Sequence, residues 1–269
     1  MVRELLKSAA NMLADSPSPL LDARVLLAHA MDKSDAALIF DMPDEKEMAL
    51  FNEYIEKRKT GIPVSYIIGE KEFMGLRFKL NQDTLIPRPD TECLVEKVLE
   101  LNNFSSPYIL DLCTGSGCIG ISLAYFLKDC RVDLTDISEN ALSEADKNAH
   151  LNGVSDRTKT FVLDVLNDEI KSDYDIIVSN PPYIETDVLS TLDVNRFEPH
   201  RALDGGADGL TFYKVIAEKA YSSLDFGGML ALEIGYNQAE SVTSLLGKFS
   251  SVSLFKDYGN NDRVIIAVK

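Results

Sequence analysis

The sequence predicts an α/β fold: a doubly wound, mostly parallel sheet with one antiparallel strand, preceded by a small helical bundle and a β-hairpin linker. Three observations predict it. From Pro107 onward, apolar strand patterns alternate with helical patterns, as in repeated βα units. The last two strand patterns are joined by a turn too short for a parallel crossover, so we expect them to be antiparallel. Residues 1–60 carry only helical periodicity.

The first part of the chain, residues 1–62, is expected to be a helical bundle. Apolar residues at helical spacing predict helices over residues 5–13, 20–30, 34–40 and 44–59. Ser18 stands where it could be the N-cap of the second of these helices. No chemistry of its own is visible in this part, so we expect it to recognise a partner or cover a site. A purely stabilising cap is the alternative.

The next part, residues 63–90, changes character. Alternating residues around Gly75 predict a β-hairpin. Farther along, two prolines flank Arg88 and keep it in a stiff, extended segment. Arg88 is either an exposed charge or an anchor for a loop near the functional site. Asp90 or Thr91 is expected to cap the helix that follows.

The last part, residues 91–269, holds the alternating elements. Strands are expected over residues 108–113, 131–137, 159–165, 174–179, 229–234, 252–256 and 264–268. Helices are expected over residues 117–127, 139–151, 210–224 and 238–249. The carboxyl ends of parallel strands meet along one edge of a sheet, where open α/β sheets bind ligands. The residues that follow these strands are therefore the candidates for a functional site.

The most informative segment, Asn180-Pro181-Pro182-Tyr183, follows a buried strand. The prolines stiffen the turn and leave its carbonyls free to accept hydrogen bonds. The Asn180 side-chain oxygen and the Pro181 carbonyl form a pair of acceptors suited to a planar –NH2 group, on which Tyr183 stacks. Accepting both N–H bonds increases the electron density on the nitrogen and directs its lone pair, so the segment is a candidate catalytic and substrate-binding site. A proline-rich turn without function is the alternative.

A glycine-rich loop follows the first strand of the predicted sheet. Gly115, Gly117 and Gly120 match the pattern G-x-G-x-x-G, and Asp136 follows about 20 residues later at the end of the second strand. Glycines allow a tight turn and a close approach of ligand, and the acid accepts hydrogen bonds from ribose hydroxyls. The pattern fits a nicotinamide cofactor and S-adenosylmethionine equally well.

Two features favour S-adenosylmethionine. Asp111 lies before the glycines, where a carboxylate can approach a cationic methionine moiety, and Asn180 with its prolines has a use in methyl transfer but none in hydride transfer. At the end of the third strand, Asp164 either contacts the adenine amino group or caps a turn. Val165 packs either on the adenine or in the core.

Composition excludes several classes of protein. The net charge is −16, with 27 basic and 43 acidic residues and no long Lys/Arg run, so nucleic-acid binding is not expected. The four cysteines form no C-x-x-C pair and are expected to be reduced thiols in a cytoplasmic protein. The three histidines are widely spaced, so no metal site is expected. No signal peptide or membrane span is visible, and the lack of coiled-coil heptads favours a monomer.

Several further segments form a set with these motifs. They are Pro63–Gly69, Glu72–Leu76, Leu85–Glu92, Asp111–Gly117, Asp136–Ser138, Ser179–Ile184, Glu198-Pro199, Ala202-Leu203, Gly205-Gly206, Asp208–Leu210 and Glu233–Gly235. Together they resemble the HemK/PrmC-type peptide chain release factor glutamine methyltransferases over nearly the whole chain. The Asn-Pro-Pro-Tyr tetrad is shared with other amino-group methyltransferases, whereas Ile86–Pro89 and Asp208–Leu210 are more specific.

The resemblance implies a helical bundle at 1–62 that recognises the release factor, a hairpin linker at 63–90 and a Rossmann-like methyltransferase domain at 91–269. It implies transfer of a methyl group from S-adenosylmethionine to the Gln side-chain nitrogen in the Gly-Gly-Gln motif of class 1 release factors, leaving S-adenosylhomocysteine. The cofactor positions of the family map to Cys113, Thr114, Gly115, Ser116, Gly117, Asp136, Val165 and Asn180.

Three positions depart from the family pattern. Cys113 stands where the family often has Gly, and we expect the loop to tolerate this small residue. Val165 replaces an aromatic residue of some members, which weakens any stacking on adenine. The turn at Gly259–Arg263 has Asn where the family usually has Gly, and Asn tolerates positive φ better than most residues.

Three rival functions remain. A nucleic-acid methyltransferase acting on exocyclic amines of adenine or guanine would use the same tetrad, but the acidic composition counts against it. A NAD-dependent dehydrogenase would need a proton-relay residue, which none of the histidines provides. A non-enzymatic binding module would leave the tetrad and the glycine loop unexplained.

Overall fold

Two units make up the chain in the computed structural model, which describes residues 2–171 and 173–269. The contacts between residues divide the chain into Met1–Glu70 and Lys71–Lys269. The three-part division predicted from the sequence, with boundaries at 62 and 90, stays a prediction, as does the recognition role of the first part.

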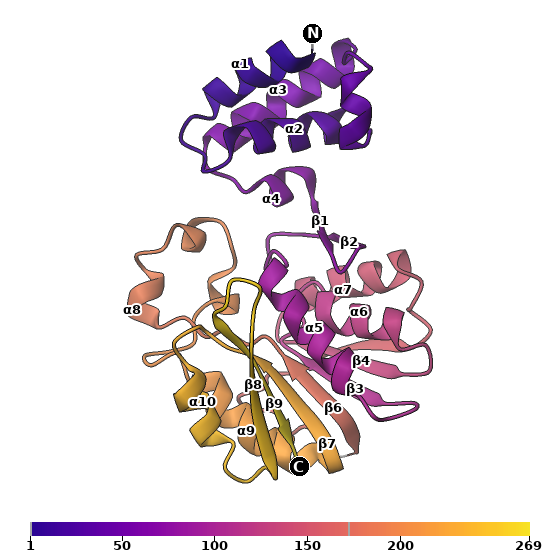
Figure 1. The fold of residues 1–269 in the computed structure, drawn as a ribbon, viewed down its shortest axis with the longest axis vertical. Coiled ribbons are helices and arrows are strands. Elements are labelled where there is room, and N and C mark those ends of the chain that lie inside the picture. Colours follow the sequence, from indigo (N-terminus) through magenta and orange to yellow (C-terminus); the bar gives the residue numbers. More distant parts are fainter. Residues whose placement is uncertain (1, 172) are drawn as a thin grey trace. The chain divides into compact units, whose positions relative to one another are not determined.

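The first unit is a small helical bundle (Figure 1). Its elements are α1 (Val2–Met12), α2 (Pro19–Ala30), the 3-10 helix η1 (Asp35–Ile39), α3 (Glu45–Lys59) and α4 (Val64–Ile68). A capping box starts α3: Asp44 Oδ1 accepts from the Glu47 backbone N–H at 2.8 Å, and Glu47 Oε2 accepts from the Asp44 N–H at 2.7 Å. At the other end of α3, Arg58 donates to Asp22 of α2 at 2.7 Å and ties the two helices together.

The predicted hairpin is confirmed as β1 (Glu70–Phe73) and β2 (Leu76–Lys79). Its turn has φ of 53° at Met74 and 72° at Gly75. Two successive positive φ angles are typical of the tight turns that match the twist of a hairpin.

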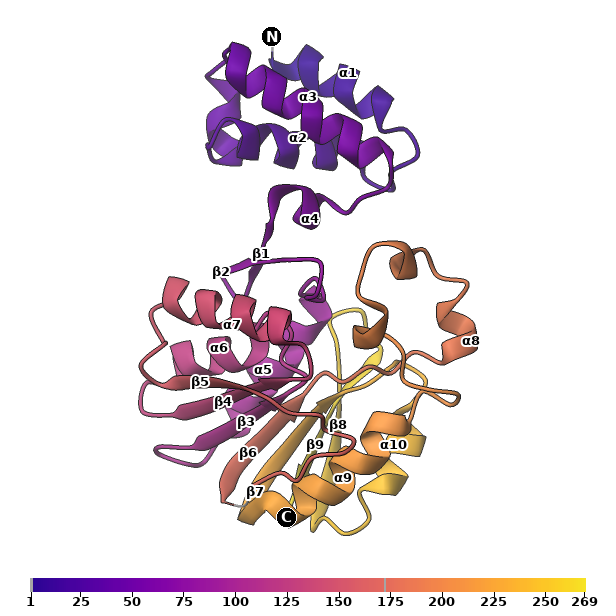
Figure 2. The ribbon, with the colours of Figure 1, turned by 180° about the vertical axis from the view of Figure 1, so that it is seen from behind.

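A seven-stranded sheet forms the centre of the second unit (Figure 2). Its strands are β3 (Tyr108–Leu112), β4 (Arg131–Asp136), β5 (Thr158–Val162), β6 (Tyr174–Ser179), β7 (Leu224–Glu233), β8 (Ser251–Lys256) and β9 (Asp262–Val268). They lie in the order β5-β4-β3-β6-β7-β9-β8. β9 is antiparallel to both of its neighbours, and the other pairs are parallel. The prediction of a mostly parallel sheet with one antiparallel strand is confirmed.

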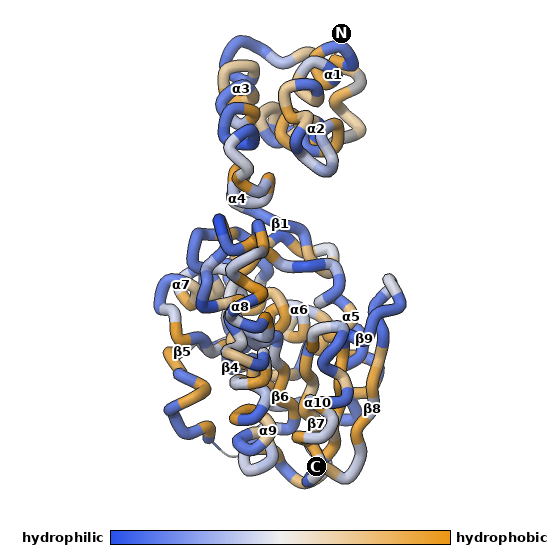
Figure 3. Tube along the Cα trace, turned by 90° about the vertical axis from the view of Figure 1, so that its left-hand side faces the viewer, coloured by the Kyte–Doolittle hydropathy of each residue, from blue (hydrophilic) through white to orange (hydrophobic). Residues whose placement is uncertain are grey.

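Helices cover both faces of this sheet (Figures 1 and 2). They are α5 (Pro89–Leu101), α6 (Cys118–Phe126) and α7 (Glu139–Leu151) on one face, and α9 (Thr211–Ser223) and α10 (Ala239–Leu245) on the other. In β6, Ile176 and Val178 pack with the first group and Ile177 with the second. Because both faces are covered, β6 and β7 are mostly hydrophobic (Figure 3).

Several predicted boundaries are wrong; the helix expected over residues 238–249, for example, ends at Leu245. The helix expected to be capped by Asp90 or Thr91 begins at Pro89 with Arg88 as N-cap, because a proline at the first helical position has no N–H to leave unpaired. β5 ends at Val162, so Asp164 lies beyond the strand in a turn of its own. β7 begins at Leu224, five residues earlier than expected, and its register with β6 shifts between Leu224 and Met229, around Gly227-Gly228.

The segment between β6 and α9 holds only short elements. They are α8 (Thr186–Leu189) and the 3-10 helices η2 (Asp193–Arg196) and η3 (His200–Ala202).

Across residues 2–171 and 173–269, each helix is too short or too polar to cross a membrane. In the same residues, no group of three or more His, Cys, Asp or Glu side chains could hold a metal ion. All four cysteines are free.

Candidate active site

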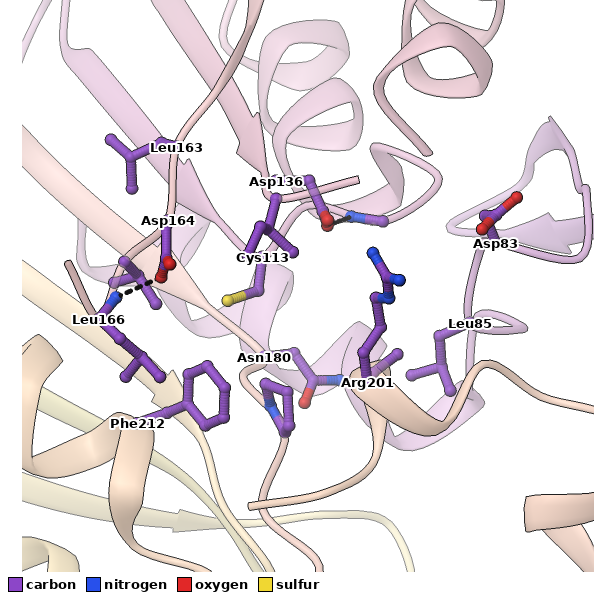
Figure 4. A pocket seen from close by; sticks show the side chains of 15 residues that line it. Asp83, Leu85, Cys113, Asp136, Leu163, Asp164, Leu166, Asn180, Arg201 and Phe212 are labelled. Carbon is purple, nitrogen blue, oxygen red and sulfur yellow. Dashed lines mark hydrogen bonds between the residues drawn. The ribbon is translucent and has the colours of Figure 1, made fainter. Parts of the chain in front are cut away.

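A pocket opens at the carboxyl ends of the strands, and we call it the first pocket (Figure 4). Seven residues predicted from the sequence line it: Cys113, Gly115, Asp136, Asp164, Val165, Asn180 and Pro182. They come from the ends of β3, β4 and β6 and from the loop after β5. The sheet thus brings together residues that are up to about 70 positions apart in the sequence.

The glycine loop joins β3 to α6 through a run of left-handed backbone. The φ angle is 59° at Cys113, 56° at Gly115 and 83° at Gly117. A side chain at Gly115 would meet no atom within 4 Å, so this backbone faces open space. Cys113 is one of five non-glycine residues with positive φ in the described chain, which gives a physical reason why a glycine suits this position.

Asp111 lies behind the glycine loop. It is fully buried, and its Oδ2 accepts from the Thr114 hydroxyl at 2.6 Å and from the Gly120 N–H at 2.9 Å. Burial raises the pKa of Asp111 to about 7. Asp111 does not line the first pocket; it fixes the loop to the start of α6. Thr114, Ser116 and Gly117 were also predicted at the site, and they too contribute to the loop and not to the pocket lining.

Asp136 ends β4 and faces the first pocket. Its Oδ2 accepts from the Gly115 N–H and its Oδ1 from the Ser138 N–H, both at 2.9 Å. With the backbone bond from Ile137 included, the carboxylate still has acceptor capacity left for a ligand. Burial raises the pKa of Asp136, while these backbone bonds and the charge of Arg201 oppose the rise. Figure 4 shows the Arg201 guanidinium pointing toward the Asp136–Gly115 hydrogen bond.

The other end of the first pocket is apolar. Leu163, Leu166 and Phe212 lie there with Val165, which is 5% exposed (Figure 4). Asp164 lies among them and caps the local turn: its Oδ1 accepts from the Leu166 N–H at 2.9 Å. Hydrogen bonds, first that from the Asn167 side chain, lower the pKa of Asp164. The turn-cap interpretation of Asp164 therefore holds, and a contact with ligand stays a prediction.

A second pocket adjoins the first at Asn180. Its lining residues are Leu85, Arg88, Asn180, Tyr183, Ile184, Val194, Ala202, Leu203 and Glu233. Asn180, Leu85 and Ala202 line both pockets. Tyr183 reaches only the second pocket, and Pro182 only the first. Asn180 is therefore placed where a ligand in one pocket would meet a ligand in the other.

Close backbone packing holds the tetrad in place. Before it, the Ser179 hydroxyl donates to the Leu112 carbonyl of β3 at 2.8 Å. After it, a side chain on Gly205 would come within 2.7 Å of Tyr183 Cα, so only glycine fits this contact. Gln238 Nε2 donates to the Tyr183 carbonyl at 3.0 Å. The Gly205-Gly206 and Asp208–Leu210 segments thus serve to hold the tetrad.

Arg88 is an anchor, one of the two roles considered for it. Its guanidinium donates to Glu198 Oε1, and Glu198 Oε2 accepts from the Ile86 N–H at 3.2 Å. The Glu198 side chain is 3% exposed. This bond joins the proline-flanked segment to the loop before η3, and Arg88 itself lines the second pocket.

Sequence reasoning missed several lining residues, notably Arg201, Phe212 and Leu166. They stand in a loop, in the short 3-10 helix η3 or at a helix start, where no periodic pattern marks them. Leu85 and Glu233 belong to segments that carried the family resemblance, but no role had been assigned to them.

Comparisons with known proteins agree with this architecture. Residues 4–69 match the PrmC N-terminal domain, and residues 89–197 match the methyltransferase small domain. The hMettl16 catalytic domain has a TM-score of 0.60 at 19% identity, covering 72% of this chain and 76% of that chain. A methyltransferase from Pyrococcus furiosus has a TM-score of 0.54 at 18% identity, covering 81% and 97%. These two structures share the fold.

Two relatives match almost end to end. The release factor glutamine methyltransferase of Clostridium botulinum is 42% identical over 260 residues, which cover 93% of this chain and 92% of that protein. The release factor glutamine methyltransferase of Moorella thermoacetica is 39% identical over an alignment of 278 residues, gaps included. This alignment covers 100% of this chain and 98% of that protein. The chain therefore belongs to the release factor glutamine methyltransferase family.

Proposed function

We propose that this protein transfers a methyl group from S-adenosylmethionine to the side-chain amide nitrogen of Gln in the Gly-Gly-Gln motif of class 1 peptide chain release factors. The observation that carries the proposal is that Asn180 lines both pockets. The first pocket would hold the methyl donor and the second the glutamine. Membership in the family supports this choice of acceptor over a nucleic acid.

The residues of the first pocket fit S-adenosylmethionine. Asp136 faces the pocket with acceptor capacity left for the ribose hydroxyls. The apolar end with Val165 and Phe212 suits a flat base, and the open backbone face of Gly115 suits the close approach of a ligand. When bound, the cofactor supplies an electrophilic methyl group on a sulfonium centre.

The tetrad acts by positioning. Asn180 Oδ1 and the Pro181 carbonyl accept the two N–H bonds of the glutamine amide, so its lone pair points at the first pocket. Tyr183 packs beside the amide, and Pro182 forms the wall toward the cofactor. Once methylated, the nitrogen is strongly acidic and loses its proton without a strong base.

The remaining parts of the proposal concern the partner. We propose that the first unit recognises the release factor, which the match of residues 4–69 to the PrmC N-terminal domain supports. We infer further that the enzyme acts in the cytoplasm as a monomer.

The test is a methyl-transfer assay with labelled S-adenosylmethionine. It offers purified release factor, a release factor with the Gln of Gly-Gly-Gln replaced by Ala, and bulk DNA and RNA. Label in the release factor that disappears with the Gln→Ala substitution supports both substrate and atom. Label in nucleic acid, with turnover that falls steeply as salt rises, would instead establish the rival methyltransferase.

Asn180→Ala tests the role of the tetrad. Removing this acceptor should lower kcat by about 10²–10³, the scale for one preorganised hydrogen-bond partner. Asn103→Ala, at an exposed position before β3, is the matched control and should leave kcat unchanged. Wild-type kcat in Asn180→Ala with saturating cofactor would contradict the mechanism.

A further inference from the structure

Glu233 is a buried acid at the second pocket that the mechanism above does not use. It is the last residue of β7 and is 1% exposed. The register of the sheet pairs Leu232 with Ser179 of β6, so the next residues of the two strands, Glu233 and Asn180, are neighbours at the same edge. Both line the second pocket.

The hydrogen bonds around Glu233 link it to the tetrad. The side chains of Thr91 and Asn180 lie beside its carboxylate and, as hydrogen-bond donors, lower its pKa. Asn180 Nδ2 also donates to Thr91 Oγ1 at 3.4 Å. The other carboxylate oxygen, Oε2, is buried without a partner among residues 2–171 and 173–269. Buried polar atoms are rarely left unpaired, so this acid is not explained by stability alone.

An ionised carboxylate only accepts hydrogen bonds, whereas a side-chain amide presents a donor group and an acceptor. With Glu233 ionised, Asn180 must turn its –NH2 group toward the acid and its Oδ1 away from it. Resting on the function proposed above, we infer that Glu233 is a positioning residue that fixes the orientation of the Asn180 amide, so that Oδ1 faces the methyl acceptor. A flipped amide would present donors to the N–H bonds of the glutamine and could not bind it.

Six charged or titratable groups face Glu233 from the surrounding elements. They are Asp90 of α5, Cys118 of α6, Tyr213 of α9, Arg263 of β9, Tyr183 of the tetrad and Arg88 beside the second pocket. Burial raises the pKa of Glu233 to about 7; the bonds from Thr91 and Asn180 and the charge of Arg263 oppose the rise, and Asp90 adds to it. Glu233 is therefore ionised above neutral pH, and its hold on Asn180 weakens as pH falls below 7.

The first experiment needs no catalysis. The side-chain 1H–15N resonances of Asn180, identified by their absence in Asn180→Ala, are followed between pH 5 and 9 in the full-length protein. In the wild type they should shift with a midpoint near 7, the pKa of Glu233. In Glu233→Gln this shift should vanish. Asn180 resonances that titrate alike in both proteins, or in neither, would overturn the inference.

The second experiment measures methyl transfer to the release factor. Glu233→Gln should lower kcat about 10- to 100-fold at pH 8, the scale for one hydrogen bond to a charged group, with little change in KM for cofactor. The matched control is Asp133→Asn, a buried acid of β4 that accepts from two tyrosine hydroxyls and lines neither pocket. Its kcat in the folded fraction should equal that of the wild type.

A double-mutant cycle separates positioning from an independent role. If Glu233 acts through Asn180, adding Glu233→Gln to Asn180→Ala should lower kcat no further. A full additional loss would overturn the inference. If the wild type methylates no glutamine while the Asn180 resonances still follow Glu233, then the proposed function fails and the positioning role stands.

Discussion

Gly120→Ala provides a sharp test of how the glycine loop is built. Gly120 lies in the first turn of α6, where its N–H donates to Asp111 Oδ2 at 2.9 Å. An added Cβ would lie 2.4 Å from Leu134 Cδ2 of β4 and 2.9 Å from Asp111 Oδ2. Both distances are shorter than van der Waals contact, so the Leu134 and Asp111 side chains or α6 itself must shift.

The expected loss follows from two terms. Overpacking of a core by one methyl group costs about 1–3 kcal/mol. Lengthening the bond to Asp111 removes part of a hydrogen bond worth about 1.5–3 kcal/mol when its partner is charged. We therefore expect the free energy of unfolding to fall by about 2–4 kcal/mol. Because Asp111 also holds Thr114, the loop should lose order, and affinity for S-adenosylhomocysteine should fall about tenfold or more.

Urea denaturation gives the free energy of unfolding, and calorimetry with S-adenosylhomocysteine gives the affinity. Gly247→Ala is the matched control, because its Cβ would meet only the Ser244 carbonyl at 3.9 Å. Its stability should stay within about 0.5 kcal/mol of the wild type. If Gly120→Ala were as stable as Gly247→Ala and bound the ligand equally well, the close packing inferred for α6 would be refuted.

Three further predictions concern charged side chains. Arg88→Ala leaves Glu198 buried without its cation and should cost about 1.5–3 kcal/mol in urea denaturation; an unchanged midpoint would show that the pair contributes nothing. Asp136→Asn should weaken S-adenosylhomocysteine binding about 10- to 100-fold by calorimetry, and equal affinity would exclude the ribose role. The pKa values of Asp111 and Glu233 are raised to about 7, so the folded state holds protons that the unfolded state releases near pH 4. Stability should therefore fall as pH rises from about 4 to 7 and then level off, and Glu233→Gln should flatten this slope; an unaltered slope would contradict the burial argument.

The central sheet was predictable because its pattern is strong. The helix at 139–151 and the strand at 174–179 have the predicted bounds, since each has clear periodicity and an end signal nearby. Boundaries failed where tertiary contacts override local pattern. At Asp164, side-chain bonds to a turn end the strand early, although the apolar run continues through Val165.

The candidate site was predictable where it follows strands. Cys113, Asp136 and Asn180 come directly after or at the end of strands, and parallel strands end at a common edge. Arg201 and Phe212 reach the first pocket from the 3-10 helix η3 and from the start of α9, and the local spacing of residues does not predict that approach. For Asp111, the sequence identified the residue but not its surroundings. Only the packing of α6 shows that this carboxylate is buried.

The position of β9 has a consequence for synthesis of the protein on the ribosome. β9 comes last in the order of the strands along the chain, yet it lies between β7 and β8. Arg263 at its start donates to the Ile234 carbonyl, directly after Glu233 of the second pocket. A nascent chain that has exported β7 but not β9 therefore has an open sheet edge beside the strand that ends in Glu233. That edge is closed only after residues 262–268 have left the exit tunnel, so we expect the sheet to be completed late in synthesis.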